Sequence, residues 1–76
     1  MSEFVKTQQE LRANLTSQIR EVIEGAESDS RGLDSAELEK INRIEADITR
    51  ADEAVAVATR NEARRSEADQ AARGFV

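Results

Sequence analysis

The sequence is 76 residues long, 36% of its residues are charged, and its formal net charge is −5, which argues against nucleic acid or an anionic membrane as the main partner. Cysteine, histidine and proline are absent, so disulfide bonds are excluded and a zinc site would lack both thiolate and imidazole ligands. No apolar run approaches the roughly 20 residues that span a bilayer, and the N-terminus lacks a signal-peptide pattern, so we expect a soluble, cytosolic, helical domain.

Residues 2 to about 24 are predicted to form a first amphipathic helix. Ser2 followed by the acidic Glu3 favours a helix start. Gly25 favours a stop, because glycine enters the left-handed conformation without a steric penalty. Gln, Glu, Arg and Lys separate the apolar residues of this helix, which are Phe4, Val5, Leu11, Leu15, Ile19, Val22 and Ile23.

Residues 25–33 are predicted to form a loop, because Gly, Ser and Asp cluster there. The segment is short relative to the helices that it joins. A short connection favours an antiparallel return of the second helix onto the first.

The start of the second predicted helix, at Ser35, carries a capping signature. The Asp34 carboxylate can accept a hydrogen bond from an orphan backbone N–H, and Glu37 at the third helical position completes an Asp-x-x-Glu capping box. Leu33 and Leu38 occupy the positions of a hydrophobic staple. Asp34 and Glu37 are therefore the predicted helix cap.

An apolar seam follows along this helix, with the three- and four-residue spacing of a helix that packs on another. The seam consists of Ile41, Ile44, Ile48, Ala51, Val55 and Ala58. Nothing in residues 59–73 stops the helix, so we expect it to reach about Arg73 and to end at Gly74. Glu62 and Arg65 take the next seam positions, so residues 59–76 are expected to be weakly packed or linker-like.

Together these elements predict an all-α fold, an antiparallel two-helix hairpin with coiled-coil-like packing and a longer second helix. The antiparallel register pairs Leu11 with Ala51 and Phe4 with Ala58, large side chains against small ones. Two helices bury only a narrow strip and the chain is short, so self-association into a helical bundle is also expected. The predicted helix–helix interface comprises Leu11, Leu15, Ile19, Val22, Leu38, Ile41, Ile44, Ile48, Ala51, Val55 and Ala58.

Carboxylates that could act in acid–base catalysis or bind a metal lie on helix faces that are predicted to be exposed to solvent. A pair such as Glu45 and Asp52 would need burial or coupled charge to tune a pKa for acid–base work. No serine has a histidine to activate it, and the glycines form no phosphate-binding pattern. We therefore predict no enzymatic activity, no cofactor and no metal site.

Four arginines give the C-terminal stretch a local positive excess: Arg60, Arg64, Arg65 and Arg73. One interpretation is contact with phosphate or with an acidic partner. The other, which the lack of aromatic residues among them favours, is basic charge near a helix C-terminus. Nucleic acid is therefore not an expected partner.

One further pattern runs through the middle of the chain. It opens with Leu33-Asp34-Ser35-Ala36-Glu37 and continues with Ile41, Ile44-Glu45-Ala46-Asp47-Ile48 and Ala51-Asp52. With the preceding amphipathic helix and the Gly/Ser-rich turn, this pattern resembles the N-terminal delta, or scaffolding, domain of tailed-bacteriophage major capsid proteins of the Hong Kong 97 fold.

The resemblance implies a scaffold for capsid assembly. Such domains project inside the immature shell, help subunits to gather with correct curvature, and are removed by a phage protease. The implied partners are other copies of the chain and other capsid subunits, with the portal and the maturation protease as further candidates. The implied locations are the bacterial host cytoplasm and the procapsid interior.

Alternatives to an intact scaffold remain open at the level of sequence. A much longer shell domain follows the delta domain in this family, whereas this sequence ends at Val76, so an excised domain, a proteolytic product and a free-standing protein are all expected possibilities. The alternative function is a stand-alone coiled-coil binding module or adaptor. A nucleic-acid-associated protein that uses the C-terminal arginines is a third.

Overall fold

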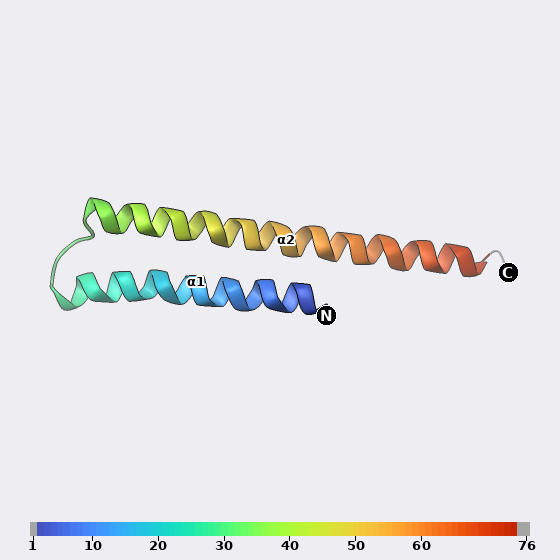
Figure 1. Cartoon of the computed structure of the whole chain (residues 1–76), viewed down its shortest axis with the longest axis horizontal. Helices are drawn as coiled ribbons and strands as arrows, with labels where there is room; N and C mark the ends of the chain where they lie inside the picture. The colour runs from blue at the N-terminus through green and yellow to red at the C-terminus, as the bar shows by residue number, and fades with distance from the viewer. Residues whose placement is uncertain (1, 75–76) are drawn as a thin grey trace.

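The computed structural model describes residues 2–74, which form two antiparallel α-helices (Figure 1). Helix α1 spans Glu3–Ser28, helix α2 spans Ser35–Gly74, and residues 29–34 connect them. No strand occurs within residues 2–74. The molecule is elongated, 69 × 17 × 12 Å, and the C-terminal part of α2 extends well past the start of α1. The predicted all-helical hairpin with a longer second helix is confirmed.

The start of α1 is fixed by local hydrogen bonds from Ser2. The Ser2 Oγ accepts a hydrogen bond from the backbone N–H of Val5 at 3.1 Å, and the Ser2 carbonyl accepts one from Lys6 at 3.0 Å. Glu3 places a negative charge in the first turn, where the positive end of the helix dipole favours it. These bonds satisfy backbone donors that would otherwise be unpaired.

The end of α1 differs from the sequence prediction, because the helix continues past Gly25 to Ser28. Ser30 adopts the left-handed conformation instead, with φ 52°. Its N–H donates to the carbonyl of Glu27 at 2.9 Å, and the N–H of Arg31 donates to the carbonyl of Ala26 at 3.1 Å. This pair of bonds is the Schellman motif. The extra turn is explained by Ala26, which is only 3% exposed and joins the core only if the helix continues.

The start of α2 carries a complete capping box. The Asp34 carboxylate accepts a hydrogen bond from the backbone N–H of Glu37 at 2.8 Å, and the Glu37 carboxylate accepts one from the backbone N–H of Asp34 at 3.1 Å. The first backbone bond of the helix runs from Leu38 N–H to the Asp34 carbonyl at 3.0 Å. Two orphan donors are thus satisfied reciprocally.

The C-terminal part of α2 is helical but uncovered. Residues 59–74 are all exposed, and they form a segment about 24 Å long at 1.5 Å per residue, which we call the overhang. The helix includes Gly74 as its last residue, and Phe75 and Val76 lie outside the described residues. The weak packing expected for this stretch therefore coexists with regular helix, because helix formers such as Ala, Arg and Glu fill it.

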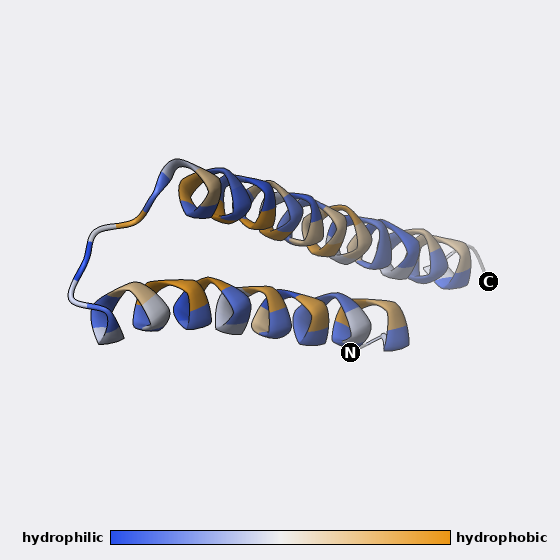
Figure 2. Cartoon of the chain, turned by 60° about the vertical axis from the view of Figure 1, so that its left-hand side comes forward, coloured by the Kyte–Doolittle hydropathy of each residue, from blue (hydrophilic) through white to orange (hydrophobic). Residues whose placement is uncertain are grey.

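The core is a thin strip between the helices. Figure 2 shows the more hydrophobic residues of both helices gathered largely on the sides that face each other. Each helix contributes a few buried apolar side chains, which are Val5, Leu15 and Ala26 from α1 and Ile41, Ile44 and Ala51 from α2. Because two of these six are alanine, the hairpin encloses little apolar volume.

Candidate association surface

The residues predicted for the helix–helix interface differ in how far they are buried. Those nearest the line of contact are buried, namely Leu15, Ile41, Ile44 and Ala51. A second group is half-buried, namely Ile19, Val22, Ile48, Val55 and Ala58. Leu11 and Leu38 are instead 46% and 49% exposed, which corrects the expectation that Leu11 is enclosed. Two helices cover only the side chains close to their line of contact, so those at the rim stay in water.

Two shallow hollows lie along one side of the hairpin. The larger, of about 660 Å³, is lined by Phe4, Arg50, Glu53, Ala54, Val57, Ala58, Arg60, Asn61 and Arg64. The smaller, of about 190 Å³, is lined by Gln8, Leu11, Leu15, Asp47, Arg50 and Ala51. Arg50 lines both, so the two hollows belong to one continuous surface, which we call the hollow face. The shared linings also place Phe4 near Ala58 and Leu11 near Ala51, in agreement with the predicted register.

The hollow face carries three of the large apolar side chains that stay exposed. Phe4 is 52%, Leu11 46% and Val57 55% exposed. Phe4 and Leu11 stand on α1 opposite Ala58 and Ala51, whose methyl groups are too short to cover them. The large-against-small pairing thus leaves a furrow that a further helix could fill.

The charge on the hollow face is mainly positive at the larger hollow. Arg50, Arg60 and Arg64 line it together with a single acid, Glu53. Arg50 is paired with Asp47 one turn earlier in α2. Arg60 and Arg64 stand on the exposed overhang, where they line the larger hollow together with Phe4 of α1. A partner for this surface would need apolar groups flanked by negative charge.

An interhelical ion pair holds the register on another side of the hairpin. The Arg12 Nε donates to the Asp52 carboxylate at 2.8 Å. Asp52 is two residues after Arg50, so it points to the opposite side of α2 from the hollow face. The two side chains are about half exposed, at 52% and 51%, and an exposed pair of this kind contributes little stability. Its effect is to disfavour a slipped antiparallel register.

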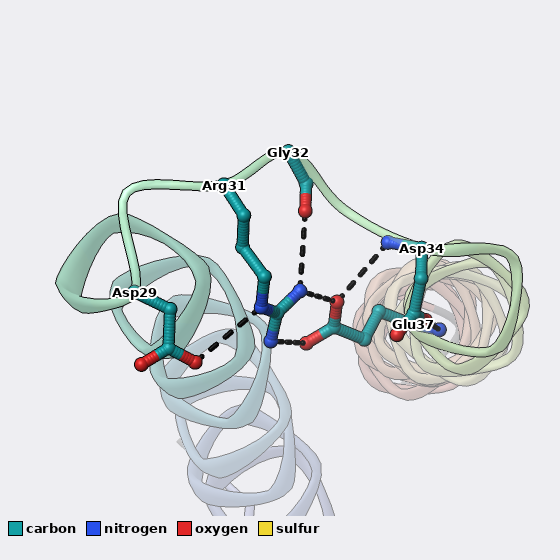
Figure 3. Close-up of polar contacts among 5 residues, drawn as sticks. All are labelled: Asp29, Arg31, Gly32, Asp34 and Glu37. Atoms are coloured by element: carbon teal, nitrogen blue, oxygen red, sulfur yellow. Dashed lines mark hydrogen bonds and ion pairs between the residues drawn. The ribbon is translucent and has the colours of Figure 1, made fainter.

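The connection between the helices is tied by Arg31 (Figure 3). Its guanidinium donates to the two oxygens of Glu37 at 2.5 and 3.1 Å, to Asp29 at 3.3 Å and to the carbonyl of Gly32 at 3.1 Å. We call these four contacts the Arg31 latch. The hydrogen bonds from Arg31, followed by the backbone N–H of Asp34, lower the pKa of Glu37 to about 2. Glu37 in turn raises the pKa of Arg31.

The Arg31 latch is not predicted by the sequence pattern of the connection. The available signal was one basic residue within an acidic turn, six positions before the capping glutamate. Spacing alone could not show the latch, because the contact depends on the path of the chain around Ser30. The latch is a structural device, since every acceptor that it engages belongs to the connection or to the first turn of α2.

No metal centre is found in the part of the chain that the structure describes. No group of three or more His, Cys, Asp or Glu side chains lies close enough to hold an ion within residues 2–74. The paired carboxylates considered from sequence, Glu45 and Asp52, are exposed. Over the same residues, neither helix is both long and apolar enough to cross a membrane.

Comparisons with protein-family models, with curated proteins and with solved structures found no match to this chain.

Proposed function

We propose that this chain is a non-enzymatic association domain that scaffolds capsid assembly through reversible helix–helix contacts with other copies of itself. The observation that carries the proposal is the hollow face, on which Phe4, Leu11 and Val57 remain about half exposed. Apolar side chains gathered on one surface mark a site where another protein surface binds.

The small core supports association as well. Six of the described residues are buried, and two of them are alanine, so the hairpin alone has little apolar burial to offset the entropy of ordering its chain. A further helix laid along the hollow face would bury more of Leu11 and Val57. Binding to the folded state then stabilises it by mass action, and the stability rises with chain concentration.

The capsid context comes from the sequence pattern between Leu33 and Asp52. Scaffolding contacts must form and later be undone, and the shallow, alanine-lined hollow face suits contacts of modest affinity. Where a shell holds neighbouring copies together, tethering raises their effective concentration to about the millimolar range, at which weak contacts are populated. The net charge of −5 would repel incoming DNA, which favours removal of the domain before the shell is filled.

Sedimentation equilibrium tests the association directly. We expect the wild-type chain to form dimers or larger oligomers as its concentration rises. The double variant Leu11→Asp, Val57→Asp should remain monomeric and helical, with a melting temperature by circular dichroism that, unlike that of the wild type, does not rise with concentration. The matched control is Ile23→Asp, Leu38→Asp, since these exposed residues line neither hollow. A monomeric wild type at millimolar concentration would rule out self-association.

The scaffolding role needs a second readout, in a capsid subunit that carries this chain as its N-terminal segment. We expect Leu11→Asp, Val57→Asp to give misassembled or aberrantly sized shells while the control assembles normally. Normal procapsids from the hollow-face variant would contradict the scaffold. A stand-alone coiled-coil binding module would then be the better description.

A further inference from the structure

The larger hollow lies beside the N-terminal end of α1, where the overhang of α2 begins. On one side stands Phe4, and on the other Ala54, Val57 and Ala58 of α2. Beyond residue 58 nothing in the described chain covers α2, and residues 59–74 are exposed throughout. A helix seated in this hollow would therefore run on along the overhang.

One line of residues on α2 continues from the hollow along the overhang. Its members alternate in spacing of three and four, so they share one side of the helix. They are Ala54, Val57, Asn61, Arg64, Ala68 and Ala71, which we call the overhang stripe. Of these, the first four line the larger hollow.

The overhang stripe is complementary to itself when two copies run antiparallel. In this arrangement a two-fold axis passes between residues 62 and 63, and residue 54 of one copy lies opposite residue 71 of the other. Residue 57 likewise lies opposite residue 68, and residue 61 lies opposite residue 64. The pairs are then Ala with Ala, Val with Ala, and Asn with Arg, each formed twice by symmetry. Small side chains let two helices approach closely, and the side-chain carbonyl of Asn61 can accept a hydrogen bond from the Arg64 guanidinium.

We propose that two copies of the chain pair their overhangs antiparallel across this two-fold axis, with the stripe of each copy seated in the larger hollow of the other. This inference rests on the proposed self-association and names its geometry. The half-exposed Phe4 of each copy would then lie against the alanines near position 68 of its partner, large against small.

Charge complementarity beside the overhang stripe favours this register. It also favours a second copy of the chain as the partner that binds the larger hollow. Arg60 lies beside the stripe, lining the larger hollow, and Glu67 lies two turns further along the same side of α2. In the antiparallel pair, Arg60 of each copy faces Glu67 of its partner, so two ion pairs form. A parallel pair in register would oppose Arg64 to Arg64, which is repulsive.

The arrangement is also free of collision. From residue 54 toward its N-terminal end, each α2 extends away from the other copy. The α1 helices, which pack on these N-terminal parts of α2, therefore do not meet. The paired region is about 26 Å long at 1.5 Å per residue. Because one hairpin is 69 Å long and its far end would lie about 50 Å from the two-fold axis, the dimer would have a maximum dimension of about 100 Å.

Charge reversal in the full chain tests the register. In Arg60→Glu, positions 60 and 67 are both acidic, and in Glu67→Arg both are basic, so each variant repels its own copies. We expect each alone to dimerise about tenfold more weakly than the wild type in sedimentation equilibrium. An equimolar mixture should recover wild-type association, because the two acidic positions of one variant then face the two basic positions of the other. The control is Arg20→Glu, the same charge change on exposed α1, which should dimerise like the wild type.

The outcomes separate this inference from the proposed function. If the wild type associates but the mixture is no tighter than either variant alone, the overhang register is wrong while self-association stands. The same holds if small-angle scattering gives a dimer close to the length of one hairpin. If the wild type is monomeric at millimolar concentration, the paired overhangs and the self-association fail together.

Discussion

The Arg31 guanidinium and the Glu37 carboxylate form a two-point contact across the connection, with hydrogen bonds of 2.5 and 3.1 Å. Glu37 also accepts the backbone N–H of Asp34 and so belongs to the capping box of α2. One carboxylate therefore holds the connection to the helix start. The geometry favours the ionised form of Glu37, which is why its pKa falls to about 2.

Glu37 makes the stability of the hairpin depend on pH. Its folded-state pKa of about 2 is below its ordinary value of 4.5, so the unfolded chain takes up the proton first as the pH falls. The stabilisation is complete above about pH 4.5 and is lost as the pH falls through about 2. We expect Glu37→Gln to melt at a lower temperature than the wild type near neutral pH, and the gap to close in acid.

The matched control for this measurement is Glu45→Gln, which changes an exposed carboxylate outside the Arg31 latch. Thermal melts followed by circular dichroism should show no comparable closing gap for it. A gap between Glu37→Gln and the wild type that is constant from neutral pH to about pH 2 would mean that the ionisation of Glu37 is not what stabilises the connection.

Gly25 should be replaceable by alanine with a gain in stability. It lies inside α1, it does not have a positive φ, and a Cβ added there would meet nothing within 4 Å. Gly25→Ala is therefore expected to raise the free energy of unfolding by about 0.5–1 kcal/mol in chemical denaturation. The reverse change at an exposed α1 position, Ala13→Gly, should lower it by a similar amount. A destabilised Gly25→Ala would instead agree with a helix that stops at this glycine.

At Ser30 the favourable change is to glycine, because this residue takes the left-handed conformation, with φ 52°. A non-glycine residue pays about 1–2 kcal/mol for that conformation. Glycine avoids this cost but loses more entropy on folding, so we expect Ser30→Gly to raise the free energy of unfolding by about 1 kcal/mol. Ser30→Ala, which removes the hydroxyl but keeps the Cβ, should bring no gain, and equal effects of the two changes would refute the backbone explanation.

Truncation in the core should separate Ile44 from Ile48. Ile44 is 6% exposed, whereas Ile48 is half-buried. Ile44→Ala is expected to cost about 2–5 kcal/mol and to melt much of the helicity, with Ile48→Ala costing less. Melts of the dilute chain, with Leu11→Ala as a rim control, check the order. A larger loss from Leu11→Ala than from Ile44→Ala would show that the core is misplaced.

The sequence alone determined the features that depend on neighbours within a turn of helix. Asp34 and Glu37 of the capping box are three positions apart, so their hydrogen bonds can be predicted from the sequence. The helical period likewise places Ile41 and Ile44, which are both buried, on one side of α2. The hairpin follows as well, because a short polar connection between two amphipathic helices leaves their apolar sides few ways to meet.

Only the tertiary structure decided where α1 ends and which seam residues are enclosed. Gly25 permits a helix stop but does not require one, and the burial of Ala26 favours continuation of the helix to Ser28. Leu11 lies four residues before the buried Leu15 and so on the same side of α1. It nevertheless stays 46% exposed, because its position opposite Ala51 leaves it uncovered. Burial depends on the size of the side chain across the interface, and periodicity along one helix carries no information about that size.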